Sequence, residues 1–106
     1  MDESSDHEEQ AASLRRSRAG KKGYITRLIN LMRRLVSESG SRRQLNLLMP
    51  KLLEALEDTR KINDQVLQLS GNDTDDVAWI EDVNFVADVA VTEVQEYLEA
   101  RTNRGE

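Results

Sequence analysis

Cysteine is absent from the 106-residue sequence, and proline and aromatic residues are scarce. Without cysteine the chain forms no disulfide, binds no metal through thiolates and has no thiol nucleophile. The single proline and the four aromatic residues argue against an all-β fold, which needs many turns and many strand-forming residues. No apolar run approaches the length needed to cross a bilayer. These absences favour an all-α protein with no membrane partner.

The first ten residues are acidic and polar, which is the opposite of a secretory signal or a transit peptide. We therefore predict an intracellular, cytoplasmic protein. The Arg-Arg-Ser-Arg run at residues 15–18 and the Lys21-Lys22 pair loosely resemble a nuclear import signal, so a nuclear location is the alternative.

Motifs for catalysis and metal binding are also missing, including the glycine-rich phosphate loops and the serine nucleophile elbow. The only histidine, His7, lies in the acidic start of the chain. The acidic run 73–76 lacks the turn glycine and the closing glutamate of a calcium loop. No histidine joins the glutamates at positions 93, 96 and 99. We predict that the protein is not an enzyme and has no catalytic residue, cofactor, metal site or small-molecule substrate.

What the sequence has in excess is charge, and the charge is segregated along the chain. Residues 1–10 contain five acids and no base, and residues 11–43 contain ten bases and one acid. Residues 71–106 contain ten acids and two bases, and the net charge of the whole chain is −5. Such a separation either attracts a charged partner or pairs parts of the chain with each other.

Apolar periodicity predicts three helices. Residues 1–12 show no such periodicity and are expected to be a disordered acidic tail. Residues 13–104 are expected to form a single helical domain, with helices at about 14–37, 41–69 and 74–102.

Turn and capping residues support these boundaries. Gly40 is suited to close the first helix in a left-handed conformation, and Ser41 with Gln44 reads as a capping box for the second. The segment 70–74 contains residues that end one helix and cap the next. Pro50 is expected to bend the second helix because its ring removes one hydrogen bond.

The second helix carries an apolar heptad pattern with alternating steps of three and four residues, which is typical of helices packed along their length. The third helix carries a matching stripe. We expect these residues to form the interaction seam: Leu45, Leu48, Leu52, Ile62, Val66 and Leu69, with Val83, Ala87 and Val94 opposite.

The first helix presents a wide apolar face made of two adjacent stripes. Its members are Tyr24, Leu28, Leu31 and Leu35 in one stripe, and Ile25, Ile29, Met32 and Val36 in the other. Because the turns are short, successive helices should be antiparallel neighbours. We predict an antiparallel three-helix bundle. The alternative is a coiled-coil-like hairpin of the second and third helices that dimerises through its exposed seam.

The basic segment allows two main interpretations. Its cations have the character of a phosphate-binding surface for non-specific contact with nucleic acid. They also lie, in the predicted bundle, beside acids of the second and third helices, which favours internal pairing. A membrane surface is the weakest interpretation because the helix lacks Trp and Phe. The candidate nucleic-acid contacts are Arg15, Arg16, Arg18, Lys21, Lys22 and Arg27.

Residues 14–98 resemble the N-terminal helical region of Gag-like polyproteins of LTR retrotransposons, of the BEL/Pao type. The sharpest part of the likeness is the pattern formed by Arg18, Ala19, Gly20, Gly23, Thr26, Arg27 and Leu28. The resemblance implies a helical assembly element in which self-association matters more than chemistry. The zinc knuckle and the protease motif of complete polyproteins are absent from the sequence, so no enzymatic activity is implied.

The sequence thus predicts a non-enzymatic structural or protein-interaction module that forms homo-oligomers. Non-specific nucleic-acid binding through residues 15–34 is the alternative function.

Overall fold

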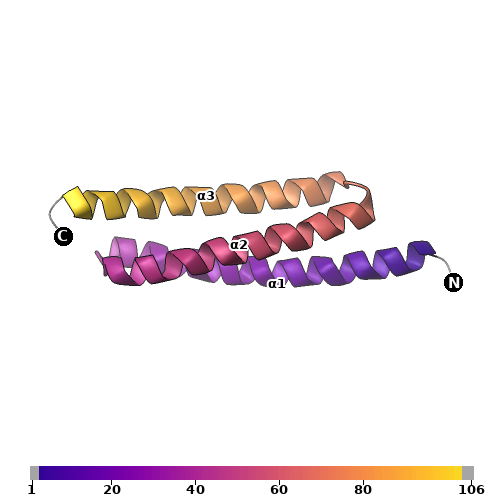
Figure 1. Cartoon of the computed structure of the whole chain (residues 1–106), viewed down its shortest axis with the longest axis horizontal. Helices are drawn as coiled ribbons and strands as arrows, with labels where there is room; N and C mark the ends of the chain where they lie inside the picture. The colour runs from indigo at the N-terminus through magenta and orange to yellow at the C-terminus, as the bar shows by residue number, and fades with distance from the viewer. Residues whose placement is uncertain (1–2, 104–106) are drawn as a thin grey trace.

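The computed structural model describes residues 3–103, which form three long helices (Figure 1). Helix α1 spans Glu3–Ser37, α2 spans Arg42–Ser70 and α3 spans Thr74–Asn103. No strand occurs within this described range. The prediction of an all-α fold is confirmed.

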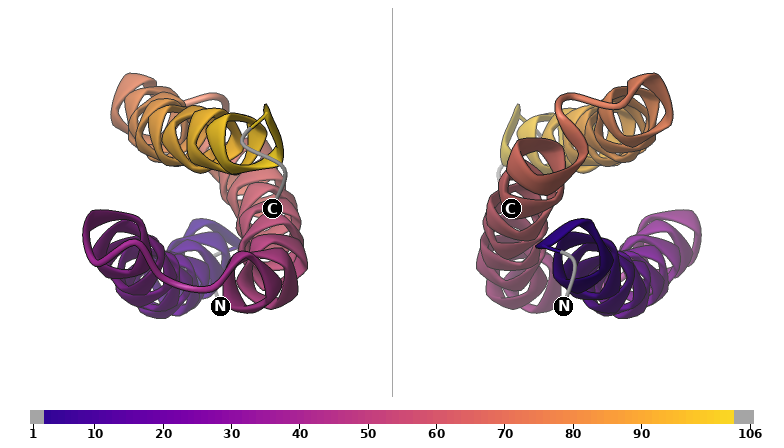
Figure 2. Two further views of the ribbon diagram at one scale, coloured as in Figure 1. Left: turned by 90° about the vertical axis from the view of Figure 1, so that its left-hand side faces the viewer. Right: turned by 90° about the vertical axis from the view of Figure 1, so that its right-hand side faces the viewer.

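The helices run up, down and up again to form an elongated bundle with extents of 65 × 18 × 17 Å (Figure 1). The views along the long axis show that α2 lies against both α1 and α3 (Figure 2). Contacts are most extensive between α1 and α2, and α3 contacts both other helices. The predicted three-helix bundle therefore holds, and an isolated hairpin of α2 and α3 is not the arrangement.

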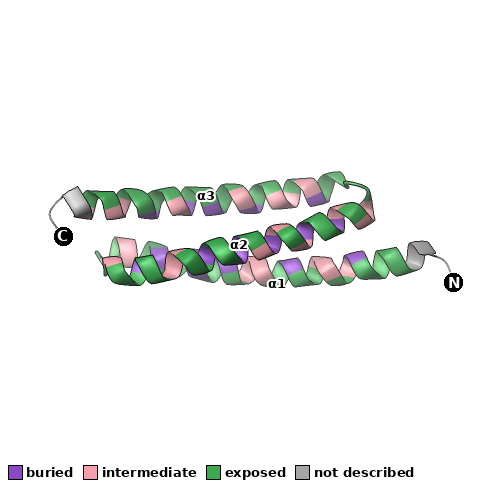
Figure 3. Ribbon diagram, in the orientation of Figure 1, coloured by how far each residue is buried: buried purple, intermediate pink, exposed green. Residues whose placement is uncertain are grey.

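One apolar core runs between the helices, along the buried inner side of each (Figure 3). Each helix contributes four fully or almost fully buried residues, which recur at helical spacing. They are Ile25, Leu28, Ile29 and Met32 from α1, Leu45, Leu52, Ala55 and Leu56 from α2, and Val83, Ala87, Ala90 and Val94 from α3.

The predicted seam lies inside this single chain. Six of its nine residues are buried and the other three, Leu48, Ile62 and Leu69, are half-buried. Near the end of α2 the buried residues are Asn63 and Val66. The residue that points into the bundle at this level is therefore Asn63, one position after the predicted Ile62. Most of the seam is thus occupied by intramolecular packing.

The apolar face of α1 is narrower than predicted. Ile25, Ile29 and Met32 are buried, whereas Tyr24 and Leu31 are 39% and 41% exposed. Only the side of α1 that meets both neighbouring helices is covered, so the outer stripe remains partly in solvent.

Helix α1 begins at Glu3, so the prediction of a disordered tail is wrong for residues 3–12, while residues 1–2 lie outside the described part. Two physical factors favour this longer helix. Ala11 is buried, and Asp6 lies close to the N-terminus of α1, where the helix dipole stabilises negative charge.

In the turn between α1 and α2, the residue in the left-handed conformation is not the predicted Gly40. Ser39 adopts the left-handed conformation, with φ of 54°. Gly40 is needed for space instead, since an added Cβ would lie 2.9 Å from atoms of Leu35. As predicted, Ser41 caps α2, and its side chain accepts a hydrogen bond of 3.3 Å from the Gln44 backbone N–H.

The turn between α2 and α3 follows the prediction closely. Gly71 ends α2 in the left-handed conformation with φ of 66°. The carboxylate of Asp73 accepts a hydrogen bond of 2.9 Å from the Asp75 N–H at the start of α3. Helix α2 continues through Pro50 as one helix.

The far end of α3 is held to the turn between α1 and α2. The hydroxyl of Tyr97 donates a hydrogen bond of 2.8 Å to the Gly40 carbonyl, and Arg101 donates one of 3.3 Å to the Ser39 carbonyl. Arg101 also donates to the Tyr97 hydroxyl. Polar contacts therefore fix α3 at the end of the apolar core, against which Tyr97 is packed.

Replacement of Leu52 by Ala should lower the free energy of unfolding by about 2–5 kcal/mol, because this side chain is completely buried and its loss leaves a cavity. Leu53→Ala is the matched control: Leu53 is 48% exposed, and its replacement should cost under about 0.5 kcal/mol. Urea unfolding followed by circular dichroism measures both. Equal losses would show that the core is misplaced.

Candidate functional site

The most distinctive polar site is a group of five side chains, three buried and two half-buried, which we call the Arg–Asp cluster. It joins all three helices next to the end of the apolar core, against which Trp79 is packed. Its members are Arg15 and Arg18 from α1, Asn63 from α2, and Asp76 and Trp79 from α3.

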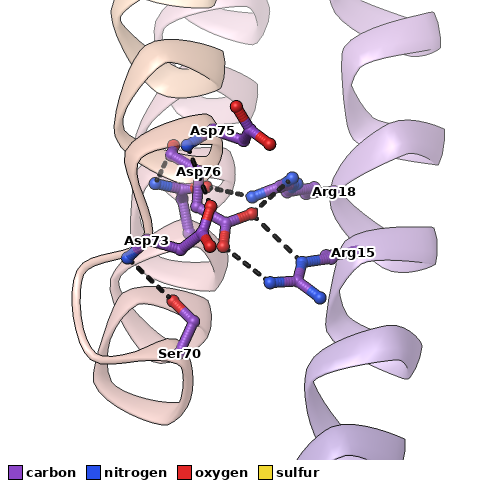
Figure 4. A network of polar contacts seen from close by, with 7 residues as sticks. Arg15, Arg18, Ser70, Asp73, Asp75 and Asp76 are labelled. Carbon is purple, nitrogen blue, oxygen red and sulfur yellow. Dashed lines mark hydrogen bonds and ion pairs between the residues drawn. The ribbon is translucent and has the colours of Figure 1, made fainter.

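Asp76 is the centre of the cluster and is only 2% exposed. Arg15 donates two hydrogen bonds to it, from Nε to Oδ1 at 3.1 Å and from Nη2 to Oδ2 at 2.7 Å. The Nη2 of Arg18 lies 2.9 Å from Oδ1 of the same carboxylate. Figure 4 shows the two guanidinium groups converging on Asp76 from α1. One carboxylate thus binds two cations, and the bidentate Arg15 contact fixes its orientation.

Arg18 is 7% exposed and has a partner on each helix it meets. Its Nη1 donates a hydrogen bond of 2.6 Å to Oδ1 of Asn63, and its guanidinium lies 4.3 Å from the centre of the Trp79 ring. Asn63 in turn donates to the Asp76 backbone carbonyl at 3.4 Å. A buried arginine needs such partners, because an unpaired buried charge is strongly unfavourable.

The local structure of α3 places Asp76 for this role. The Asp73 side chain begins the helix by accepting the Asp75 N–H. The Ser70 hydroxyl accepts the Asp73 N–H at 3.3 Å and ties the turn to α2 (Figure 4). Asp76 therefore falls in the first turn of α3, where the helix dipole also favours a carboxylate.

The cluster shifts the acidity of its members. The hydrogen bonds from Arg15 lower the pKa of Asp76 below its ordinary value, and those from Arg18 act in the same direction, against the opposing effect of burial. The hydrogen bond with Asp76 likewise raises the pKa of Arg15. Asp76 is therefore a carboxylate over the whole physiological range of pH.

The six candidate nucleic-acid contacts fall into two groups. Four of them lie against acids of the same chain: Arg15 and Arg18 contact Asp76, Lys21 Nζ is 3.9 Å from Asp58, and Lys22 Nζ is 4.0 Å from Asp82. The other two, Arg16 and Arg27, are exposed on α1. The structure thus divides the predicted site, since most of its charge is paired internally.

Sequence reasoning missed two members of the cluster, Asn63 and Trp79. Asn63 sits next to Ile62, which fits the heptad steps equally well, so apolar pattern alone favours Ile62. Trp79 fits the apolar face of α3 by its spacing and is half-buried against the core, but its ring also faces Arg18. One sequence signal could have identified these residues as members of the cluster. A polar residue interrupts the apolar stripe of one helix at the level of the bundle where another helix carries cations.

A second feature is the outer surface of α3. Phe85 is 69% exposed, and Val86 and Val89 are 41% and 37% exposed. Val86 also matches the helical spacing of the apolar face of α3, yet it is exposed. A shallow hollow of about 350 Å³, here called the α3 hollow, is lined by Phe85, Asp88, Val89, Thr92, Glu93 and Glu96.

Within residues 3–103, no three His, Cys, Asp or Glu residues are grouped closely enough to hold a metal ion. Nor does any helix in this range combine the length and apolar character required to span a membrane.

Replacement of Asp76 by Ala should lower the free energy of unfolding by about 3–5 kcal/mol, because it leaves two arginines without their counter-ion and one of them is buried. The control is Asp75→Ala, at an exposed neighbour in the same helical turn, with an expected loss of about 0.3–1 kcal/mol. Similar losses in urea unfolding would remove the central role of Asp76.

Stability should also fall at acid pH because of Asp76. Its pKa is lower in the folded chain than the unfolded value of about 3.9, so its stabilisation is complete above roughly pH 5 and is lost as the pH falls toward the folded pKa. Asp76→Asn should flatten this dependence. Urea midpoints from pH 7 to pH 2, read from the fluorescence of the single tryptophan Trp79, measure the effect. An unchanged dependence in the variant would contradict it.

No protein-family model, curated protein or solved structure matches the chain. The resemblance to Gag-like proteins therefore stays a prediction.

Proposed function

We propose that this chain is a non-enzymatic structural module that associates with copies of itself. The observation that carries the proposal is the apolar surface of α3, where Phe85 is 69% exposed beside the partly exposed Val86 and Val89. Contiguous exposed apolar side chains rimmed by polar ones are typical of protein–protein contact surfaces. Aromatic residues are also enriched at such surfaces.

The total surface area points the same way. The chain exposes 6977 Å², whereas a compact protein of its mass exposes about 6,000 Å². The difference of roughly 1,000 Å² follows from the elongated shape of the bundle, 65 × 18 × 17 Å. A rod that is three helices wide leaves the outer face of every helix uncovered, so association is a direct way to reduce this area.

Non-specific nucleic-acid binding is the competing function. The internal ion pairs weaken its support, because a cation already paired with a carboxylate releases fewer counter-ions when it meets a phosphate. Of the six candidate residues, only Arg16 and Arg27 have no carboxylate at ion-pair distance among the described residues. Arg34, which also lies within residues 15–34, is likewise exposed with no carboxylate at ion-pair distance among the described residues. Three such contacts would give weak binding with a shallow dependence on salt.

The proposal agrees with the assembly role that the resemblance to Gag-like proteins implies, but it does not rest on that resemblance. It also requires no catalytic group, which suits a surface composed of apolar and charged side chains.

Sedimentation velocity or light scattering from low to high micromolar concentration tests the proposal. The average mass of the wild-type chain should rise with concentration, and Phe85→Ser should lower the association constant by at least tenfold, as expected when an interface loses an aromatic anchor. Leu47→Ser is the control, because Leu47 is 62% exposed on α2 and outside this surface.

A wild-type chain that remains a monomer at high micromolar concentration would overturn self-association. Titration with duplex DNA and with single-stranded RNA at low and moderate salt tests the competing function. Tight binding that falls steeply with salt would favour that function instead.

A further inference from the structure

Charge is sorted between the two parallel helices α1 and α3. Residues 10–37 of α1 contain eight bases and no acid, and residues 74–100 of α3 contain eight acids and no base. Any contact between these two stretches, within one chain or between two copies, therefore brings opposite charges together in every register. Contacts of α1 with α1 or of α3 with α3 would instead oppose like charges.

Pairing within the chain uses five of the eight bases of α1. Four of them contact acids of α3: Arg15 and Arg18 both contact Asp76, Lys22 contacts Asp82, and Arg33 contacts Glu93. The fifth, Lys21, contacts Asp58 of α2.

The three bases that remain are Arg16, Arg27 and Arg34, all exposed. Their spacings of eleven and seven residues are close to whole numbers of helical turns, so they lie along one line on α1. Buried residues such as Ile25 and Met32 lie on the opposite side of the helix. These arginines form a basic row that faces away from the core.

Helix α3 carries an acidic row with the same spacing in the reverse direction. Glu99 and Asp88 are eleven residues apart, and Asp88 and Glu81 are seven apart. All three are exposed, and within the described residues none of them pairs with a base. Along a helix these intervals correspond to about 16 and 10 Å, as they do in the basic row.

We propose that the basic row of one copy docks antiparallel on the acidic row of a second copy. Arg16 then lies opposite Glu99, Arg27 opposite Asp88, and Arg34 opposite Glu81. This inference rests on the proposed self-association and specifies which surfaces meet. Its basis is the matched spacing of two oppositely charged rows that intramolecular ion pairs leave unused; the only aromatic contact in the basic row among the described residues is that of Arg27, 6.0 Å from the centre of the Tyr24 ring.

The α3 hollow supports the position of the central pair. Its wall includes the exposed ring of Phe85, and Asp88 and two glutamates lie at its rim. A guanidinium group fits this chemistry, because it binds carboxylates through a planar set of donors and also stacks on aromatic rings. Arg27 of the second copy is the occupant that the matched rows place there.

The surface of α1 between its arginines is open enough for this contact. A methyl group added at Gly20 would meet no atom within 4 Å, and one added at Gly23 would meet the Arg27 side chain at 3.8 Å. In the proposed register these glycines lie opposite Gln95 and Thr92 of the second copy. The absence of side chains at both glycines lets the two helices approach closely.

Charge reversal tests this docking mode in the full chain. Arg27→Glu and Asp88→Arg should each lower the association constant by at least tenfold, because each sets like charges against each other. The double variant, Arg27→Glu with Asp88→Arg, should return to within about threefold of wild type. Lys61→Glu is the control, because it reverses an exposed charge on α2 outside both rows.

Circular dichroism and urea unfolding establish that each variant keeps the fold. If the wild-type chain associates but both single reversals leave its association unchanged, or the double variant fails to recover, the docking mode is overturned while self-association stands. If the wild-type chain does not associate, both fail. If Arg27→Glu instead abolishes salt-dependent binding of duplex DNA by a monomeric chain, the basic row is a nucleic-acid surface and the docking mode is likewise overturned.

Discussion

The shared carboxylate of Asp76 is the interaction on which the arrangement of the three helices most depends. Apolar side chains build the core from Ile25 to Met32 of α1, but beyond that region α1 has few apolar residues left to bury. Asp76 replaces them as the point of contact, since it binds two arginines of α1 and its backbone carbonyl accepts from Asn63 of α2. To bring its two arginines to Asp76, helix α1 has to extend well beyond the stretch that carries its core residues.

Ion pairs also help to set the alignment of α1 with α3, which apolar burial alone does not specify. The pairs Lys22–Asp82 and Arg33–Glu93 join α1 to α3 with the same offset of sixty residues. Exposed pairs of this kind contribute little stability individually, so the buried contacts of Arg18 have the larger effect. Together they favour one register of α1 against α3 over slipped alternatives.

Sequence reasoning predicted the parts of the fold that depend on local pattern. Helical periodicity located the three helices and most of the core, and capping residues such as Ser41 located the second helix start. It failed where tertiary contact decides the outcome. The burial of Asn63 depends on Arg18, which is 45 residues away in the chain, and the exposure of Leu31 and Phe85 depends on which sides of α1 and α3 the neighbouring helices leave uncovered. No local pattern contains that information.

The polar contacts at the two ends of α3 have a consequence for how copies can exchange parts. Three-helix bundles with short turns can dimerise by domain swapping, in which a terminal helix leaves its own chain and packs on another. Here α3 is held by Asp76 at one end and by Tyr97 and Arg101 at the other. A swap would have to release both ends of α3 together, so these contacts oppose the exchange of this helix between copies.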